Sequence, residues 1–165
     1  MKTLLLLRHA KSSWKNSNLT DHDRPLNKRG KRDAPRMGYL LRREELTPGQ
    51  IISSTARRAR ETAALVAEQS GFTAAVELNS NLYHASPEAL ATVLHELYYE
   101  DDPVLLVAHN PGLERFLELL TGQYEPLPTA ALAHITLDLA DWRQLRPETR
   151  GTLVNLWRPR ELELI

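Results

Sequence analysis

Short apolar runs alternate along the chain with longer amphipathic stretches, and this alternation predicts the secondary structure. Thr3–Leu7 and Pro103–Ala108 are continuous apolar runs, the pattern of strands buried on both faces of a parallel sheet. Weaker runs predict further strands at Gln50–Ser53, Ala74–Leu78, Ala131–Leu137 and Thr152–Trp157. Strands that alternate with helices in this way indicate an α/β fold, a three-layer α/β/α sandwich with a mainly parallel central sheet.

The stretches between these runs carry apolar residues at helical spacing. Two helices are predicted over about residues 27–45 and 56–70, and Gly71 is a typical stop signal for the second. Two more should begin at Ser86-Pro87 and at Asn110-Pro111, because each pair places a capping side chain before a proline. Residues 11–28 lack periodicity, and a loop of this length in a compact domain is often functional.

Length and composition limit the class of protein. A chain of 165 residues predicts one domain, residues 1–165, and no stretch approaches the roughly 20 apolar residues of a membrane-spanning helix. The absence of cysteine excludes disulfides, thiolate catalysis and cysteine-based metal sites. We therefore expect a soluble, cytoplasmic protein without a membrane partner. The adjacent tyrosines Tyr98 and Tyr99 are expected in the core and at its rim.

The charges are distributed unevenly although they sum to zero. Residues 1–60 contain 15 Lys/Arg and five Asp/Glu, whereas residues 61–165 contain six and 16. This excess predicts a local anion site or a nucleic-acid-binding face in the first third of the chain. The anion site is favoured, because the basic residues are not interleaved with aromatic side chains and no nucleic-acid-binding motif is present. We therefore expect no nucleic-acid partner.

Candidate chemistry lies at the ends of three predicted strands. The first strand runs into Arg8-His9, the second into Ser53-Ser54-Thr55 and a helix start, and the fourth into His109-Asn110. Ligands of open α/β sheets bind at the carboxyl ends of the strands, so these residues should meet in one crevice. A helix N-terminus and arginines there favour a bound anion, which arginine can hold through two parallel hydrogen bonds.

These motifs resemble those of a known family. Leu7-Arg8-His9-Ala10 is similar to the RHG-type signature of the histidine phosphatase superfamily, with Ala10 in place of the usual glycine. The segment 54–62 (STARRARET) resembles the second motif of that family, and the segment 107–112 (VAHNPG) resembles the third. Together with Asp23-Arg24-Pro25-Leu26-Asn27 and the short chain, they resemble the SixA-type phosphohistidine phosphatases. This resemblance implies a phosphoglycerate-mutase-like fold in its minimal form, without a cap domain.

The resemblance also implies roles for single residues. His9 would attack phosphorus, Arg8 and Arg58 would hold the phosphoryl oxygens, and a protonated His109 would add a donor. Arg57 is the alternative to Arg58 if the register of the motif is shifted by one residue. No cofactor and no metal are expected, because the arginines and histidine supply the positive charge and the histidines lack zinc-ligand spacing.

Substrate contacts are predicted around this centre, and one role stays open. Arg24, Asn110 and Asn16 are candidate substrate-binding residues, and Lys11 and Ser12 are further candidates. A general acid could be Glu88, Asp21 or Asp23. The resemblance implies that none is required, because SixA-type enzymes lack a dedicated acid. The expected substrate is therefore a phosphohistidine-bearing protein, such as a histidine phosphotransfer domain. The alternatives are a small phosphorylated molecule as substrate, or a non-catalytic module that binds phosphate or a phosphoprotein.

Overall fold

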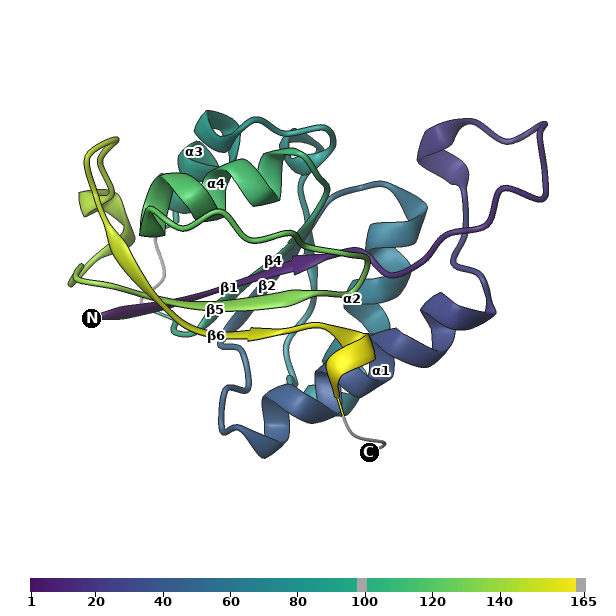
Figure 1. The fold of residues 1–165 in the computed structure, drawn as a ribbon, viewed down its shortest axis with the longest axis horizontal. Coiled ribbons are helices and arrows are strands. Elements are labelled where there is room, and N and C mark those ends of the chain that lie inside the picture. Colours follow the sequence, from purple (N-terminus) through teal and green to yellow (C-terminus); the bar gives the residue numbers. More distant parts are fainter. Residues whose placement is uncertain (98–100, 163–165) are drawn as a thin grey trace.

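The computed structural model describes residues 1–97 and 101–162, and its centre is a six-stranded sheet in the order β3-β2-β4-β1-β5-β6 (Figure 1). The strands are β1 Lys2–Arg8, β2 Gln50–Ser53, β3 Glu77–Leu78, β4 Val104–Ala108, β5 Leu132–Leu137 and β6 Gly151–Trp157. The helices are α1 Lys28–Arg43, α2 Arg57–Ser70, α3 Pro87–His95 and α4 Gly112–Thr121. The predicted α/β sandwich is confirmed. The expectation for Tyr98 and Tyr99 lies outside the described residues.

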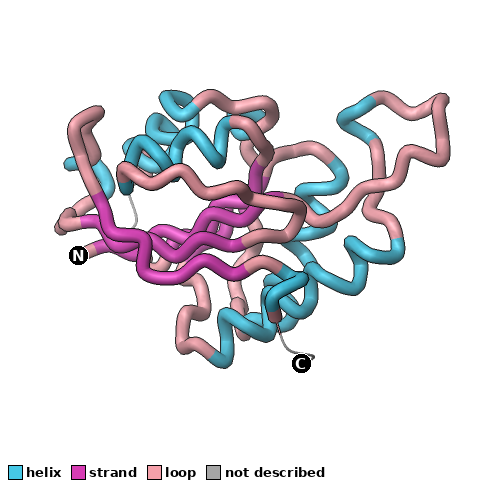
Figure 2. The backbone as a smooth tube through the Cα atoms, viewed as in Figure 1, coloured by secondary structure: helices cyan, strands magenta, loops and turns pink. Residues whose placement is uncertain are grey.

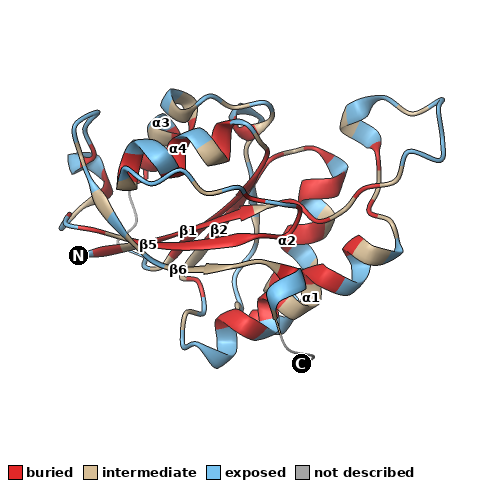
Figure 3. Cartoon of the chain, viewed as in Figure 1, coloured by how far each residue is buried: buried red, intermediate tan, exposed pale blue. Residues whose placement is uncertain are grey.

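Two hydrophobic cores cover the two faces of the sheet. Helices α1 and α2 pack on one face, and α3 and α4 pack on the other (Figure 1). Because successive side chains of a strand point to opposite faces, Leu4 and Leu6 of β1 join the α3/α4 core, whereas Leu5 and Leu7 join the α1/α2 core. The buried positions accordingly concentrate in β1, β2 and β5 and on the inner faces of the helices (Figure 3).

The sheet is mixed, which refines the expectation of a mainly parallel one. Strands β1 to β4 are parallel, but β5 runs antiparallel to β1 and β6 antiparallel to β5. Strand β3 covers only Glu77–Leu78 of the predicted Ala74–Leu78, because this edge segment is largely exposed and gains little from burial. No helix within the described ranges is long and apolar enough to cross a membrane.

The parallel strands end at one edge, and this alignment places the candidate chemistry. Arg8 pairs with Ala108, and Ser53 pairs with Val107, so the residues after β1, β2 and β4 emerge side by side. The segment between β1 and α1 continues outward from this edge, mostly as loop (Figure 2). Its base is fixed by close packing: a Cβ added at Gly30 of α1 would lie 2.2 Å from the backbone oxygen of Lys11.

Candidate active site

The three predicted strand-end motifs meet in one cavity of about 310 Å³. All four candidate catalytic residues line it, together with the predicted contacts Arg24, Asn110, Lys11 and Ser12. The full lining comprises Arg8, His9, Lys11, Ser12, Trp14, Arg24, Arg58, His84, His109, Asn110 and Thr129. The cavity is therefore rich in positive charge, and it lies where open α/β folds bind their ligands.

His9 is buried and held in one orientation directly after β1. Its Nδ1 lies 2.8 Å from the backbone oxygen of Ala10, and a carbonyl can only accept, so Nδ1 carries the proton and Nε2 keeps its lone pair. Burial, and then the positive charges of Arg58, Arg8 and Arg24, lower the pKa of His9 from 6.5 to about 3. At neutral pH this imidazole is an uncharged nucleophile.

Arg58 reaches the cavity from the first turn of α2. It is buried, whereas Arg57 is exposed and pairs with Glu61 at 3.4 Å, so the structure brings Arg58 and not Arg57 to the cavity. Thr62, one helical turn later, donates to the Arg58 carbonyl oxygen at 2.7 Å and accepts from the Ala10 backbone N–H at 2.9 Å. Thr62 thus ties the start of α2 to the loop that carries His9.

His109 follows β4, and its ring centroid lies 5.1 Å from that of His9. Burial, and then the neighbouring His9 and Arg58, lower the pKa of His109 from 6.5 to about 3, which favours the neutral ring. A protonated His109 during the reaction stays a prediction. Its Nε2 lies 2.8 Å from the Ser54 hydroxyl, which accepts from the Ala56 N–H and so has its own proton for the ring. When Ser54 donates to Nε2, the ring proton of His109 lies on Nδ1.

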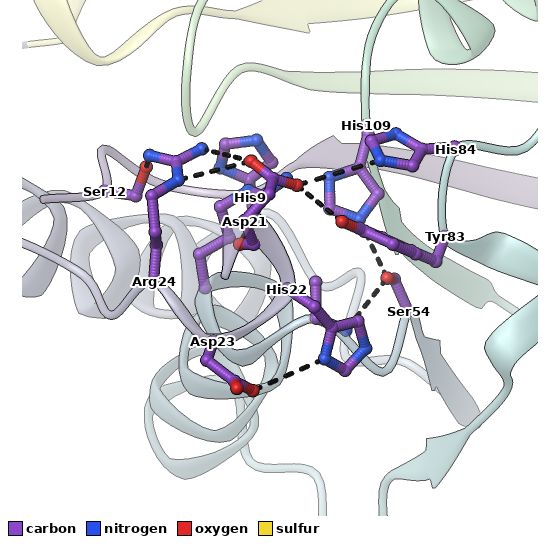
Figure 4. A network of polar contacts seen from close by, with 12 residues as sticks. His9, Ser12, Asp21, His22, Asp23, Arg24, Ser54, Tyr83, His84 and His109 are labelled. Carbon is purple, nitrogen blue, oxygen red and sulfur yellow. Dashed lines mark hydrogen bonds and ion pairs between the residues drawn. The ribbon is translucent and has the colours of Figure 1, made fainter. Parts of the chain in front are cut away.

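Asp21, from the segment between β1 and α1, is the carboxylate that pairs with the arginines of the site (Figure 4). Its carboxylate accepts from Arg58 at 3.1 Å, from Arg24 at 3.0 Å and from the Tyr83 hydroxyl at 2.5 Å. Burial alone would raise the pKa of Asp21, but the hydrogen bonds from Tyr83, Arg24 and Arg58 hold it below its ordinary range. Asp21 is therefore a carboxylate and not a proton donor at neutral pH.

Arg24 is fixed on three sides. Besides Asp21, it donates to the Ser12 hydroxyl at 2.6 Å, and its guanidinium lies 3.5 Å from the ring centroid of Trp14. The electrons on the face of the aromatic ring attract the positive charge of the guanidinium above it. Trp14, which could be expected either in a core or at the site, is exposed and forms part of the rim.

Arg8 and Asn110 donate hydrogen bonds to the same backbone oxygen. The Leu127 backbone oxygen accepts from Arg8 at 3.1 Å and from the Asn110 side chain at 2.8 Å. This bond explains a difference from the prediction at the start of α4: Pro111 occupies the capping position, and Asn110 donates to Leu127 instead of capping the helix.

Three nitrogen atoms at the cavity lack partners. Nε of Arg8, Nε of Arg58 and Nδ1 of His109 are buried and have no hydrogen-bond partner among the described residues. A buried polar atom without a partner costs free energy and requires an explanation. Three such atoms on residues around one positively charged cavity match the oxygens of a bound oxyanion. Within residues 1–97 and 101–162, no group of three His, Asp or Glu side chains could hold a metal ion.

Three candidates from the sequence are not brought to this cavity. Asn16 is exposed, and its side chain accepts from the Asn18 N–H at 3.0 Å in a local turn. Glu88 lines a separate cavity of about 530 Å³ between α3, α4 and residues 145–147, and Asp23 pairs with His22 at 3.6 Å. Ala10 is buried in the α1/α2 core, so its methyl group does not narrow the approach to His9.

Several other residues at the site carry no assigned role in the sequence analysis, among them Trp14 and His84 of the cavity lining. Tyr83 bonds Asp21, Ser54 orients His109, and Thr129 lines the cavity. Ser54 belongs to the second motif and could have been found there. Tyr83 and Thr129 lie outside the three motifs, and no local pattern marks them.

The comparisons with known proteins agree with this geometry. Residues 4–85 match the family model described as histidine phosphatase superfamily (branch 1). The crystal structure of the SixA protein from Agrobacterium tumefaciens superposes with a TM-score of 0.79 at 27% identity and covers 96% of this chain and 98% of that one. The chain belongs to the histidine phosphatase superfamily. Within this superfamily it is of the SixA type.

Two further relatives extend this result. The uncharacterized protein Rv1276c from Mycobacterium tuberculosis is 38% identical over 155 residues, which are 86% of this chain and 92% of that protein. The structure of the protein histidine phosphatase SixA complexed with tungstate has a TM-score of 0.82 at 22% identity and covers 98% of this chain and 99% of that one. This last likeness shows the fold, which is phosphoglycerate-mutase-like and minimal, without a cap. Together with the family model, the structural neighbours support a phosphatase.

Proposed function

We propose that the protein removes the phosphoryl group from a phosphohistidine in another protein, through a covalent phosphohistidine intermediate on His9. One observation carries this proposal. The neutral His9 ring, with its proton fixed on Nδ1 and its Nε2 lone pair free, lines the same cavity as the unpartnered Nε atoms of Arg8 and Arg58. A nucleophile and the donors for a phosphoryl group thus lie together in one cavity.

The chemistry proceeds in two displacements. In the first, Nε2 of His9 forms a bond to phosphorus while the P–N bond of the substrate breaks, and the substrate imidazole leaves as the neutral ring. Arg8, Arg58 and the Nδ1–H of His109 hold the three phosphoryl oxygens during the transfer. In the second, water attacks phosphorus, phosphate leaves, and His9 returns to its neutral form. A phosphoryl group passed between two imidazoles requires no acid for the leaving group, which agrees with the absence of Glu88 and Asp23 from the cavity.

Access to the site favours a protein substrate. His84 and Trp14 at the rim of the cavity are largely exposed, and no described segment forms a cap over them. A phosphohistidine side chain that projects from a folded partner could therefore reach His9. A structural neighbour, the protein histidine phosphatase SixA, is complexed with tungstate, and tungstate has the tetrahedral geometry and charge of phosphate. The cytoplasmic location remains a prediction.

The test is phosphate release from a phosphorylated histidine phosphotransfer domain. The wild type should turn it over, and His9→Asn, which keeps a polar side chain of similar size but no nucleophile, should lose at least about 1,000-fold in rate. The matched control is His95→Asn, which replaces an exposed histidine at the end of α3. It should keep full activity.

Two outcomes would contradict the proposal. Undiminished turnover by His9→Asn would remove His9 as the nucleophile. Binding of the phosphorylated domain by the wild type without any release of phosphate would support the alternative of a phosphoprotein-binding module.

A further inference from the structure

His84 is a titratable group at the cavity that the mechanism on phosphohistidine does not use. It lies between β3 and α3 in the left-handed backbone region, with φ of 54°. Its side chain is 63% exposed, and its ring lies 3.9 Å from that of Tyr83 and 6.0 Å from that of His109, measured between centroids. Because His84 also lines the cavity with His9, it stands between solvent and the reacting groups.

Asp21 lies at ion-pair distance from this histidine. Nε2 of His84 lies 3.7 Å from Oδ2 of Asp21, the oxygen that also accepts from Arg58 and Tyr83 (Figure 4). The contact is an ion pair whenever the ring is protonated. A carboxylate beside an imidazole is a common means of orienting a histidine that transfers protons.

The other groups near the cavity are poor proton donors. Asp21 is a carboxylate, and burial lowers the pKa of His109 so that the ring is neutral at pH 7. Burial, and then the hydrogen bond to Asp21, raise the pKa of Tyr83, so its proton is held more tightly than usual. His84 differs from all three because its ring is exposed and can exchange protons with water.

We propose that His84 is the proton donor to the leaving group, and that it gives the protein a second activity on phosphate monoesters. This inference rests on the proposed role of His9. An alkoxide or phenoxide leaves phosphorus slowly unless it receives a proton, whereas the imidazole of a phosphohistidine leaves as a neutral ring. His84 thus supplies the general acid that the hydrolysis of esters requires. It lines the cavity, whereas Glu88 and Asp23 do not.

The ester reaction balances with this assignment. Nε2 of His9 forms a bond to phosphorus, the P–O bond to the leaving group breaks, and an N–H of the protonated His84 ring gives its proton to that oxygen. The alcohol departs and leaves His84 neutral. Water then attacks the phosphorylated His9, gives a proton to His84 and releases phosphate, so that both histidines return to their starting forms.

The test compares leaving groups of graded acidity. Aryl phosphates from nitrophenyl phosphates to phenyl phosphate are assayed with the wild type and with His84→Asn, since asparagine tolerates the left-handed backbone of this position. The variant should lose little rate with the most acidic phenol and about 100-fold or more with phenyl phosphate, because the need for a general acid grows as the leaving group becomes more basic. Turnover of the phosphohistidine protein should be nearly unchanged.

Two controls separate a chemical role from a structural one. The first control is His22→Asn. The His22 ring lies 4.8 Å from that of Tyr83 and contacts Thr55, and neither His22 nor Thr55 belongs to the cavity lining. This variant should leave the rates of the whole aryl phosphate series unchanged. His84→Gln provides a second variant without a donor in case His84→Asn is unstable, and thermal melting checks the folding of both.

Each other outcome overturns the proposal. A loss of equal size across the series would show that His84 only positions neighbouring groups, and no loss would show that it is not the donor. A wild type that turns over the phosphoprotein but no ester would refute the second activity and leave the proposed function intact. A wild type that turns over neither substrate would refute both.

Discussion

Two carboxylate–arginine networks in this chain differ in how they are built. On α1, Asp33 is 1% exposed and pairs with Arg29 at 3.7 Å, Arg32 at 3.2 Å and Arg36 at 3.3 Å, all neighbours on the same helix. At the cavity, the side chain of Asp21 is 41% exposed and pairs with Arg24 and Arg58, which come from a loop and from α2.

The difference shows how a basic region can serve two purposes. The carboxylate of Asp33 is buried and all of its arginine partners lie on the same helix, so this network belongs to the structure of α1. The carboxylate of Asp21 is accessible, and an incoming phosphoryl group can take its place on Arg24 and Arg58. Among the basic residues of the first 60 positions, Arg8, Lys11, Arg24 and Arg58 line the cavity, whereas many of the others lie on α1. The anion site itself stays a prediction.

The sharpest contrast should come from one arginine of each network. Arg58→Ala removes a donor for the transferring phosphoryl group, and arginines in that role contribute about 10³-fold or more to phosphoryl transfer. Arg36→Ala removes a partner of Asp33 and should leave turnover unchanged, since it lies outside the cavity lining. Phosphate release by the two purified variants measures the contrast. Equal losses in both would mean that the networks are not functionally distinct.

Acid should destabilise the cavity network selectively, because only that network surrounds buried histidines. The pKa values of His9 and His109 are about 3 in the folded chain and near 6.5 when unfolded, so the unfolded state binds more protons below pH 6.5. Stability is fully present above pH 6.5 and falls toward pH 3, by about 3 kcal/mol for the pair at pH 5.5. Urea unfolding at several pH values measures this loss.

Variants assign the pH dependence to its source. His9→Asn should remove about half of the loss between pH 7.5 and pH 5.5, whereas Asp33→Asn should keep all of it. A pH dependence that is undiminished when both His9 and His109 are replaced by asparagine would contradict the assignment, whereas a remainder is expected from His134, whose pKa burial also lowers.

Replacing each carboxylate by an amide should lower the free energy of unfolding by different amounts in the two networks. Asp33→Asn leaves three arginines around a buried neutral group and should cost about 2 kcal/mol of unfolding free energy. Asp21→Asn should cost less than about 1 kcal/mol, because its carboxylate is partly solvated and its ion pairs are screened. Urea titrations at neutral pH test the order, and a reversed order would refute the view that only the Asp33 network is structural.

The smallest expected effect concerns oxyanion affinity. The carboxylate of Asp21 accepts hydrogen bonds from Arg24 and Arg58 and would compete with an oxyanion for them, so Asp21→Asn should let phosphate or tungstate bind about 3- to 10-fold more tightly as a competitive inhibitor. Arg57→Gln, beside Arg58 but exposed, is the control and should not change the inhibition constant. Weaker inhibition of Asp21→Asn would show that Asp21 positions the arginines rather than competing with phosphate.

Much of the fold and of the site could be predicted from the sequence, because the central strands are marked by their apolar residues. Leu4–Leu7 and Val104–Ala108 are apolar without interruption because β1 and β4 are central, and their ends place His9 and His109 together. The contacts of Asp21 and Tyr83 could not be predicted, because both residues lie between the regular elements. In such segments no hydrophobic periodicity indicates which side chains point toward the end of the sheet. The antiparallel direction of β5 and β6 within this mainly parallel sheet could not be predicted, because β5 is buried much like a parallel strand.

The most direct test of the central claim is to trap the phosphoryl group on the enzyme. A phosphorylated histidine phosphotransfer domain is mixed with the wild type, the reaction is stopped in alkali, where phosphohistidine survives, and the peptides are mapped by mass spectrometry. The account predicts phosphate on the peptide that contains His9, and no trapped phosphate on the same peptide of His9→Asn. Phosphate release with the label on another residue, or with no labelled enzyme at any time point, would contradict it.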